Sequence, residues 1–205
     1  MYDEHHEKTS PRSRASSGRK ADSHARIVEV AARAIRRTGY DGTGVADIMK
    51  EAGLTHGGFY AHFASRDALL AEAADHAGAQ TVATSAQIAS SVPPEQAAVA
   101  LMQAYLSDGH LNNLESGCPI AALGSEMPRQ APAVRQAATR RIKEMIDLAA
   151  RQFPDWGTPQ AHERALVTVC AMAGTLMLAR AVDNPALSTA MRDAVLAHFG
   201  AAGVA

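Results

Sequence analysis

Small and hydrogen-bonding residues are concentrated between residues 43 and 66 of this 205-residue chain. Hydroxyl, imidazole and guanidinium groups can bond the phosphate oxygens and base edges of nucleic acid. The consecutive Gly57 and Gly58 would each cost a helix about 1 kcal/mol relative to alanine, but they leave a bare backbone that another surface can approach closely. The residues that could make such contacts are Thr43, Thr55, His56, Gly57, Gly58, Tyr60, His62 and Arg66.

A second reactive group is the thiol of Cys118, one of two cysteines in the chain. The sequence Gly117-Cys118-Pro119 opens a short predicted helix, and the helix dipole favours a thiolate at that end. Cys118 could therefore react with an electrophile or an oxidant, and the alternative is a small, buried packing residue. His110 could also serve the thiol as a base in a cysteine-dependent enzyme.

The sequence lacks the motifs of several common enzyme classes. It has no Gly-x-Ser-x-Gly elbow, P-loop, dinucleotide-binding glycine motif or His-Glu-x-x-His metal site. We therefore expect a protein that is not an enzyme and that carries no cofactor and no metal.

Four helices joined by short turns are predicted to position the first set of residues. Apolar residues of the first helix repeat at helical spacing from Asp22, and Gly39 ends that helix. A turn over residues 53–55 joins the second and third helices, so the pair has the layout of a helix-turn-helix, whose later helix enters the major groove. The second, third and fourth helices begin at residues that can cap a helix, namely Thr43, Thr55 and Ser65.

Beyond residue 90, prolines mark the starts of further helices, because the first turn of a helix has no partner for the N–H that proline lacks. No alternating strand pattern occurs in the sequence. The expected fold is all-α with about nine helices. Those in the second half are predicted over residues 93–109, 117–128, 132–153, 159–182 and 185–199. The expected organisation is a disordered tail over residues 1–20, a helix-turn-helix domain over 21–66 and a helical domain over 67–205.

Charge is unevenly distributed along the chain. Residues 12–66 hold ten Lys or Arg against five Asp or Glu, whereas residues 67–205 hold nine against thirteen. A basic segment on an otherwise acidic protein indicates contact with a polyanion, and a chance excess of solvated arginine is the alternative. The polar N-terminus has no signal-peptide core, and we expect no membrane span. These features predict a soluble cytoplasmic protein.

Residues 22–70 resemble the DNA-binding domain of the TetR/AcrR family of bacterial transcriptional regulators. The family motif has a Gly-Tyr, a Thr before the second helix, an Ala-Gly turn, and a Tyr-x-x-Phe ahead of Ser-Lys-x-x-Leu. Arg66 replaces the lysine of the last element; it keeps the charge but offers a fork of donors. The chain has Gly39-Tyr40, Thr43, Ala52-Gly53, Tyr60-Ala61-His62-Phe63 and Ser65-Arg66-Asp67-Ala68-Leu69.

The resemblance implies that the partner is a double-stranded DNA operator. Thr43 would bond a phosphate, Thr55 and His56 would lie where bases or phosphates are read, and Tyr60 would reach the DNA backbone. Gly57 lacks the longer side chain of many relatives, which argues against direct base reading at that position. His62 and Arg66 would hold phosphates on the far side.

The resemblance also implies a small-molecule inducer and a homodimer formed by the helices at about 160–182 and 187–199. Such a protein would be a ligand-responsive regulator, most often a repressor, on a palindromic operator; a DNA-binding protein without a ligand is the alternative. Flexible methionines suit an adaptable apolar pocket, although each of these residues could equally belong to an ordinary core. The candidate pocket residues are Met102, Tyr105, Leu106, Cys118, Met145, Phe153, Trp156, Met172 and Met177.

Overall fold

The computed structural model describes residues 11–201, with side chains from Gly18 to Gly200. This part of the chain has nine α-helices, two short 3-10 helices and no strand, so the predicted all-α fold is confirmed. In chain order the elements are α1 (Pro11–Thr38), α2 (Val45–Glu51), η1 (His56–Ala61), α3 (Arg66–Ser90), α4 (Pro94–Tyr105), α5 (Asp108–Asn112), α6 (Pro119–Leu123), η2 (Met127–Arg129), α7 (Pro132–Ala150), α8 (Pro159–Ala181) and α9 (Pro185–Ala201).

The first helix starts well before its predicted beginning at Asp22. α1 begins at Pro11, so the structure describes residues 11–20 of the expected disordered tail as helical, and residues 1–10 lie outside the described residues. Proline is compatible with the first turn of a helix, and the next proline along the chain is Pro93. Gly18 is the only glycine between Pro11 and Gly39, so no cluster of strong helix breakers interrupts this polar sequence.

Two further predicted helices differ in the structure. The helix predicted to begin at Thr55 is the 3-10 helix η1, and the helix predicted over residues 93–109 is divided into α4 and α5. The division occurs at Ser107, whose side-chain oxygen accepts a hydrogen bond from the His110 N–H at 3.2 Å and so caps a new helix. The number of α-helices in the described residues equals the predicted nine, but α5 was not predicted as a separate helix, and the predicted third helix is the 3-10 helix η1.

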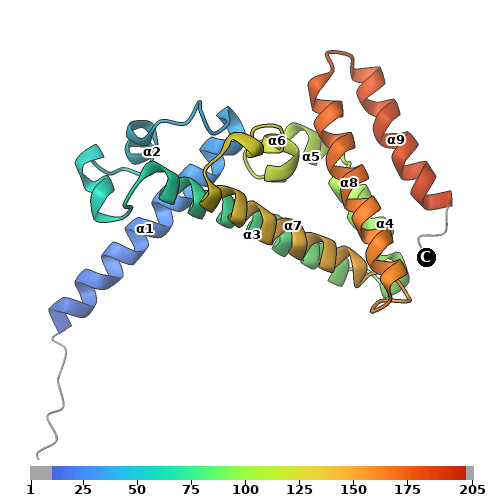
Figure 1. Cartoon of the computed structure of the whole chain (residues 1–205), viewed down its shortest axis with the longest axis horizontal. Coiled ribbons are helices and arrows are strands. Elements are labelled where there is room, and N and C mark those ends of the chain that lie inside the picture. The colour runs from blue at the N-terminus through green and yellow to red at the C-terminus, as the bar shows by residue number, and fades with distance from the viewer. Residues whose placement is uncertain (1–10, 202–205) are drawn as a thin grey trace, which may run out of the picture.

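The helices form an elongated molecule in which α3 and α7 run side by side through the middle (Figure 1). α1, α2 and η1 lie at one end, and the antiparallel pair α8 and α9 lies at the other. α3 and α7 approach closely because Gly78 has no side chain: a Cβ there would lie only 2.6 Å from the Cβ of Arg141. Asp75 on α3 bonds both Arg140 (2.8 Å) and Arg141 (2.5 Å) of α7.

Two apolar cores share the long helices. The first core joins α1, α2, η1 and the first half of α3, but it also takes in Leu123 of α6 and Val134 and Ala137 of α7. The second core joins α4, α6, α7 and α8. The proposed domain boundary at residue 66 therefore crosses continuous packing, because α3, α6 and α7 each contribute to both ends of the molecule.

α8 is the only helix in the described part of the chain that is long and apolar enough to cross a membrane, with a mean hydropathy of 1.4. The core helix of a soluble protein passes the same test, and α8 packs against α7 and α9. Its apolar character comes from two faces: one is buried in the second core, and the other is exposed.

Candidate functional site

The turn between α2 and η1 is built from local geometry. Gly53 adopts a left-handed conformation with φ +70°, which glycine accepts without steric cost. The N–H of Leu54 then bonds the carbonyl of Met49 at 2.8 Å and closes the end of α2. Thr55 is the extended residue that precedes η1. Phe59 on η1 is buried and stacks on Phe63 at 5.6 Å, which fixes η1 against the core.

One side of η1 faces outward with most of the residues predicted for nucleic-acid contact. Thr55, His56, Gly57 and Tyr60 are exposed, and Tyr60 keeps 74% of its surface accessible. A Cβ on Gly57 would meet nothing within 4 Å, and one on Gly58 would make only ordinary contacts at 3.7 Å. Neither glycine has a positive φ. Neither the space around these positions nor their backbone conformation therefore requires a glycine.

Thr43 and Arg66 are placed differently from what the sequence predicted. Gly44, not Thr43, is the N-cap of α2, so the predicted cap is wrong. The Thr43 hydroxyl is buried and donates to the Gly39 carbonyl at 2.7 Å. The guanidinium of Arg66 donates to the carbonyl oxygens of Tyr40 and Thr43. Both side chains thus hold the loop between α1 and α2, an internal role that only the folded chain reveals, and their phosphate contacts stay predictions.

His62 lies at the end of η1 beside the first helix. Its ring is half-buried, 5.9 Å from the ring of His24, which itself stacks on Phe63 at 4.5 Å and bonds Glu72 at 2.7 Å. Burial lowers the pKa of His62, and the positive charges of His24 and Lys20 lower it further. The ring of His24 therefore packs the first helix against the end of η1 at the edge of the outward-facing surface.

Several arginines of the basic segment are already engaged within the protein, two of them in exposed ion pairs and one by burial. Glu51 bonds Arg33 at 3.2 Å and Arg37 at 3.3 Å, which ties α2 to α1, and Arg36 is buried. The positive charge available to a partner is therefore smaller than the sequence suggests. In the described residues up to η1, the exposed cations other than Arg37 are Arg19, Lys20, Arg26 and Lys50.

A cavity of about 270 Å³ lies between α3, α4, α5 and the start of α6. Six of the nine polar groups in its lining are hydroxyls, with one amide, one imidazole and one thiol, and none of its lining residues is Asp, Glu, Lys or Arg. Ile88, Leu101 and Ala104 supply its apolar wall. The polar lining residues are Thr81, Thr84, Ser85, Tyr105, Ser107, His110, Asn113, Ser116 and Cys118.

Only two of the predicted pocket residues line this cavity, Tyr105 and Cys118. Trp156 and Met177 are exposed, at 60% and 40%. The other five belong to the second apolar core, namely Met102, Leu106, Met145, Phe153 and Met172. The serines and threonines of α3 and α4–α5 that do line it were missed, because a hydroxyl residue on a long helix gives no sequence signal that a cavity faces it.

Cys118 forms part of the cavity wall, but the residue is only 2% exposed to solvent. Burial raises the pKa of the neighbouring Tyr105 phenol well above its usual value, and the nearby Cys118 adds to that shift.

His110 cannot take a proton from the Cys118 thiol in this arrangement. Its Nδ1–H donates to the Tyr105 carbonyl at 2.7 Å, and its Nε2 accepts the backbone N–H of Cys118 at 2.9 Å. Both ring nitrogens are therefore occupied by backbone groups, which removes the geometry for a Cys118–His110 nucleophile and base.

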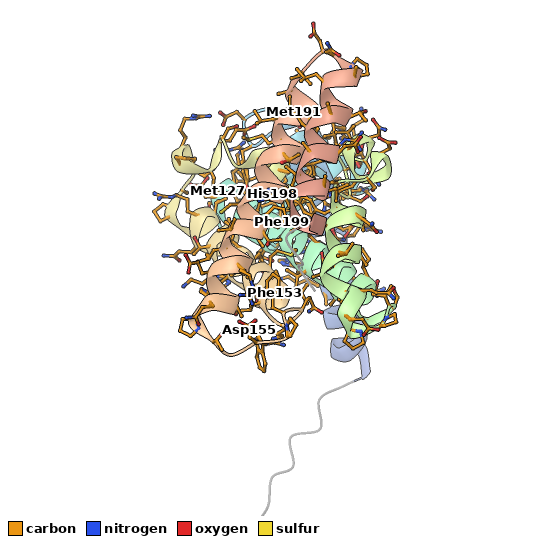
Figure 2. The ribbon with its side chains drawn as sticks, turned by 90° about the vertical axis from the view of Figure 1, so that its right-hand side faces the viewer. Met127, Phe153, Asp155, Met191, His198 and Phe199 are labelled. Carbon is orange, nitrogen blue, oxygen red and sulfur yellow. The ribbon has the colours of Figure 1, made fainter. Side chains whose placement is uncertain are left out.

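The outer side of α8 and α9 presents apolar side chains to solvent. Figure 2 looks onto this side and labels Met191 and His198 of α9. Cys170 of α8 is also exposed on this helix. The large exposed apolar residues of the two helices are Leu166, Val167, Met177, Leu178 and Leu187.

Two family models match the chain. The model described as bacterial regulatory proteins of the TetR family matches residues 27–73, which contain the C-terminal part of α1, all of α2 and η1, and the start of α3. The model described as the C-terminal domain of LmrA/YxaF-like transcriptional regulators matches residues 94–193. No curated protein matches the sequence.

Solved structures with a similar fold cover most of the chain. The reduced form of NemR from E. coli has a TM-score of 0.73 at 18% identity, covering 86% of this chain and 94% of that one. A TetR regulator from Chloroflexus aurantiacus has a TM-score of 0.71 at 24% identity, with coverages of 89% and 96%. A TetR family regulator from Agrobacterium tumefaciens has a TM-score of 0.72 at 20% identity, with coverages of 87% and 98%.

The buried His110 should make stability depend on pH. Burial lowers its pKa below the ordinary value of 6.5, opposed by the bond to the Tyr105 carbonyl and reinforced by the charge of Arg180. As pH falls below about 6.5, the unfolded chain binds a proton that the folded chain refuses, so the free energy of unfolding decreases. Above that pH both states are neutral at this position and the effect vanishes.

We expect His110→Asn to lose less stability than the wild type between about pH 7.5 and about pH 5.5. The measurement is urea unfolding of both proteins at one protein concentration. His62, whose pKa burial also lowers, titrates in both proteins and cancels in the comparison. An equal loss of stability in the two proteins would contradict the prediction.

Proposed function

The chain belongs to the TetR family of bacterial regulatory proteins, and from this premise we propose that it is a repressor that binds a palindromic operator as a homodimer and is released by a small molecule. The observation that carries the proposal is the outward surface of η1, where polar residues and two structurally unnecessary glycines stand together. A bare backbone at that point suits the close approach of a DNA groove.

Within this proposal the candidate residues have different roles at the DNA. Thr55, His56 and Tyr60 are exposed on or beside η1 and would reach bases or phosphates. Gly57 and Gly58 would let the backbone approach the groove. His62 would hold a phosphate at the edge, whereas Thr43 and Arg66 would act mainly by fixing the loop that carries α2.

The exposed apolar face of α8 and α9 supports the proposed homodimer. Val167 and Leu178 are more than half exposed, at 57% and 53%, and a large apolar patch in water favours association. A two-fold axis through this face would bury the same patch of both copies. It would also separate two copies of η1, as needed for half-sites about 34 Å or a multiple of that apart.

The cavity beside Cys118 supports the proposed release by a small molecule. Its size limits the ligand to a small one, and its hydroxyl, amide and imidazole lining favours an uncharged molecule with hydrogen-bonding groups. The thiol in its wall would let an electrophile or an oxidant act there. A DNA-binding protein without a ligand is the alternative, and it predicts a specific operator complex that no small molecule relieves. Action on DNA implies a cytoplasmic protein.

Tyr60→Phe should weaken operator binding by roughly fivefold, since a hydrogen bond contributes about 1 kcal/mol. The measurement is the Kd at fixed salt for a duplex selected from a random library. The melting temperature should not change, because the Tyr60 side chain is 74% exposed. Tyr40→Phe is the matched control and should leave the Kd unchanged, because the Tyr40 hydroxyl is buried away from the surface and has no hydrogen-bond partner in the described structure. Unchanged affinity of Tyr60→Phe would remove Tyr60 from the contact surface.

Leu178→Glu should convert the dimer to a monomer, because two buried carboxylates would face each other across the proposed interface. Sedimentation velocity measures the change. Leu114→Glu is the control: Leu114 is also an exposed leucine, at 41%, but it lies between α5 and α6 rather than on α8 or α9. A dimer that survives Leu178→Glu would disprove the interface.

Cys118 can be tested with N-ethylmaleimide in a Cys170→Ser background, where it is the only cysteine. The thiolate sulfur adds to the carbon–carbon double bond of the maleimide, and the adjacent carbon takes up a proton. We expect the reagent to release DNA from this variant and not from Cys118→Ser/Cys170→Ser. Release from both proteins, or from neither, would leave Cys118 as a packing residue.

A further inference from the structure

One peptide group in the cavity wall is held from both of its ends. The carbonyl of Gly117 accepts a hydrogen bond from Nη1 of Arg36 at 3.3 Å. The N–H of Cys118, which belongs to the same peptide plane, donates to Nε2 of His110 at 2.9 Å. The plane therefore lies between α1 on one side and α5 on the other, and it cannot rotate without breaking one of the two bonds.

On the α1 side, Arg36 is a buried cation with neutral partners. It is 3% exposed, and besides Gly117 it bonds the Ala32 carbonyl at 3.0 Å and the Gln80 side-chain oxygen at 3.0 Å. Gln80 in turn bonds Glu29 at 2.9 Å. One guanidinium thus joins the cavity wall to both α1 and α3, which carry the helix-turn-helix.

On the cavity side, His110 is fixed by other helices. Its Nδ1–H is bonded to the end of α4 through the Tyr105 carbonyl, and its own carbonyl accepts from Arg180 of α8 at 2.6 Å. Gly117 fits against it only without a side chain, because a Cβ would lie 2.6 Å from the Asn113 carbonyl and 3.0 Å from the His110 ring. His110, Gly117 and Cys118 all line the cavity.

We propose that the Gly117–Cys118 peptide group is the switch between the cavity and the DNA-binding helices, and that Arg36 is the positioning residue that responds to its orientation. A hydroxyl or carbonyl group of a cavity ligand that takes the Cys118 N–H, or that donates to His110, frees the peptide to turn. Arg36 then loses one of its three acceptors while buried, which is costly, and α1 shifts to satisfy it. The link to DNA rests on the proposed function; the clamp on the peptide does not.

A neighbouring ion pair provides the comparison. Arg37 also reaches this segment, through Glu115 at 2.9 Å, but both side chains are more than 40% exposed. Exposed pairs contribute little, and Arg37 does not touch the 117–118 peptide. Replacing Arg36 and Arg37 by the same residue therefore separates the buried bond from a surface attraction to the same segment.

Hydrogen exchange of the free protein tests the clamp without any ligand or DNA. The amides of residues 116–118 are each hydrogen-bonded, to Asn113, Leu114 and His110. We expect Arg36→Met to speed exchange of the peptide that contains them by roughly tenfold or more, because bonds to charged groups are the strong ones. Arg37→Met should stay within about threefold of wild type. Equal effects of the two variants would overturn the clamp.

A second arm uses operator DNA bound to the full chain, with a duplex selected from a random library. DNA should slow exchange of residues 116–118 in the wild type and in Arg37→Met, because coupling between two sites is reciprocal. In Arg36→Met, DNA still binds but leaves that exchange unchanged. Equal protection by DNA in Arg36→Met would overturn the switch. A wild type that binds no duplex would refute the proposed function instead, and the free-protein arm would still judge the clamp.

If Arg36→Met fails to fold, as judged by circular dichroism, Gln80→Met replaces it. That variant removes the Gln80 acceptor at 3.0 Å and leaves the bond to Gly117 in place. We expect the exchange rate of residues 116–118 in this variant to exceed the wild-type rate, but by less than the tenfold expected for Arg36→Met. Wild-type exchange in Gln80→Met would overturn the proposal that α3 supports Arg36.

Discussion

The arrangement depends on α3, a single helix of 25 residues shared by the two ends of the molecule. Leu69, Leu70 and Ala73 near its start are buried in the core with α1, α2 and η1, whereas Thr81 and Ser85 further along line the cavity. Such a helix spans about 37 Å, and its packing against α7 admits no side chain at Gly78. Because it is continuous and closely packed, α3 would carry a displacement of the cavity wall toward the helix-turn-helix under the proposed function.

The helix-turn-helix was predictable because its determinants are local. The left-handed Gly53 and the Ser65 cap, whose oxygen accepts the Ala68 N–H at 3.1 Å, are readable from a few neighbouring residues. The role of Arg66 was not, since its carbonyl partners lie 23 and 26 residues away and only the fold brings them near. Thr43 was missed for another reason: its partner, the Gly39 carbonyl, is only four residues away, but a helix cap and a bond within the loop are both local alternatives for a threonine at this position.

The cavity could not be found from apolar residues, because a methionine or an aromatic ring lowers its free energy most by filling a core. Met102, Met145 and Met172 do so in the second core. The space left over is the one that hydroxyl groups can line, since they keep hydrogen-bonding partners in water or in a ligand. The hydrogen-bonding groups in the lining therefore give a physical reason for the cavity to suit a molecule that can bond them.

Arg36 shows why stability alone does not account for this interface. A buried cation surrounded by neutral acceptors costs more than an apolar side chain of similar volume, and such replacements often stabilise proteins. Burial does lower the pKa of Arg36, against the charge of Glu29, although a guanidinium stays protonated. The directional bonds of the guanidinium give something that packing cannot, a fixed orientation of the Gly117–Cys118 peptide relative to α1 and α3. A cost in stability at the contact between cavity and DNA-binding helices is what a two-state element would require.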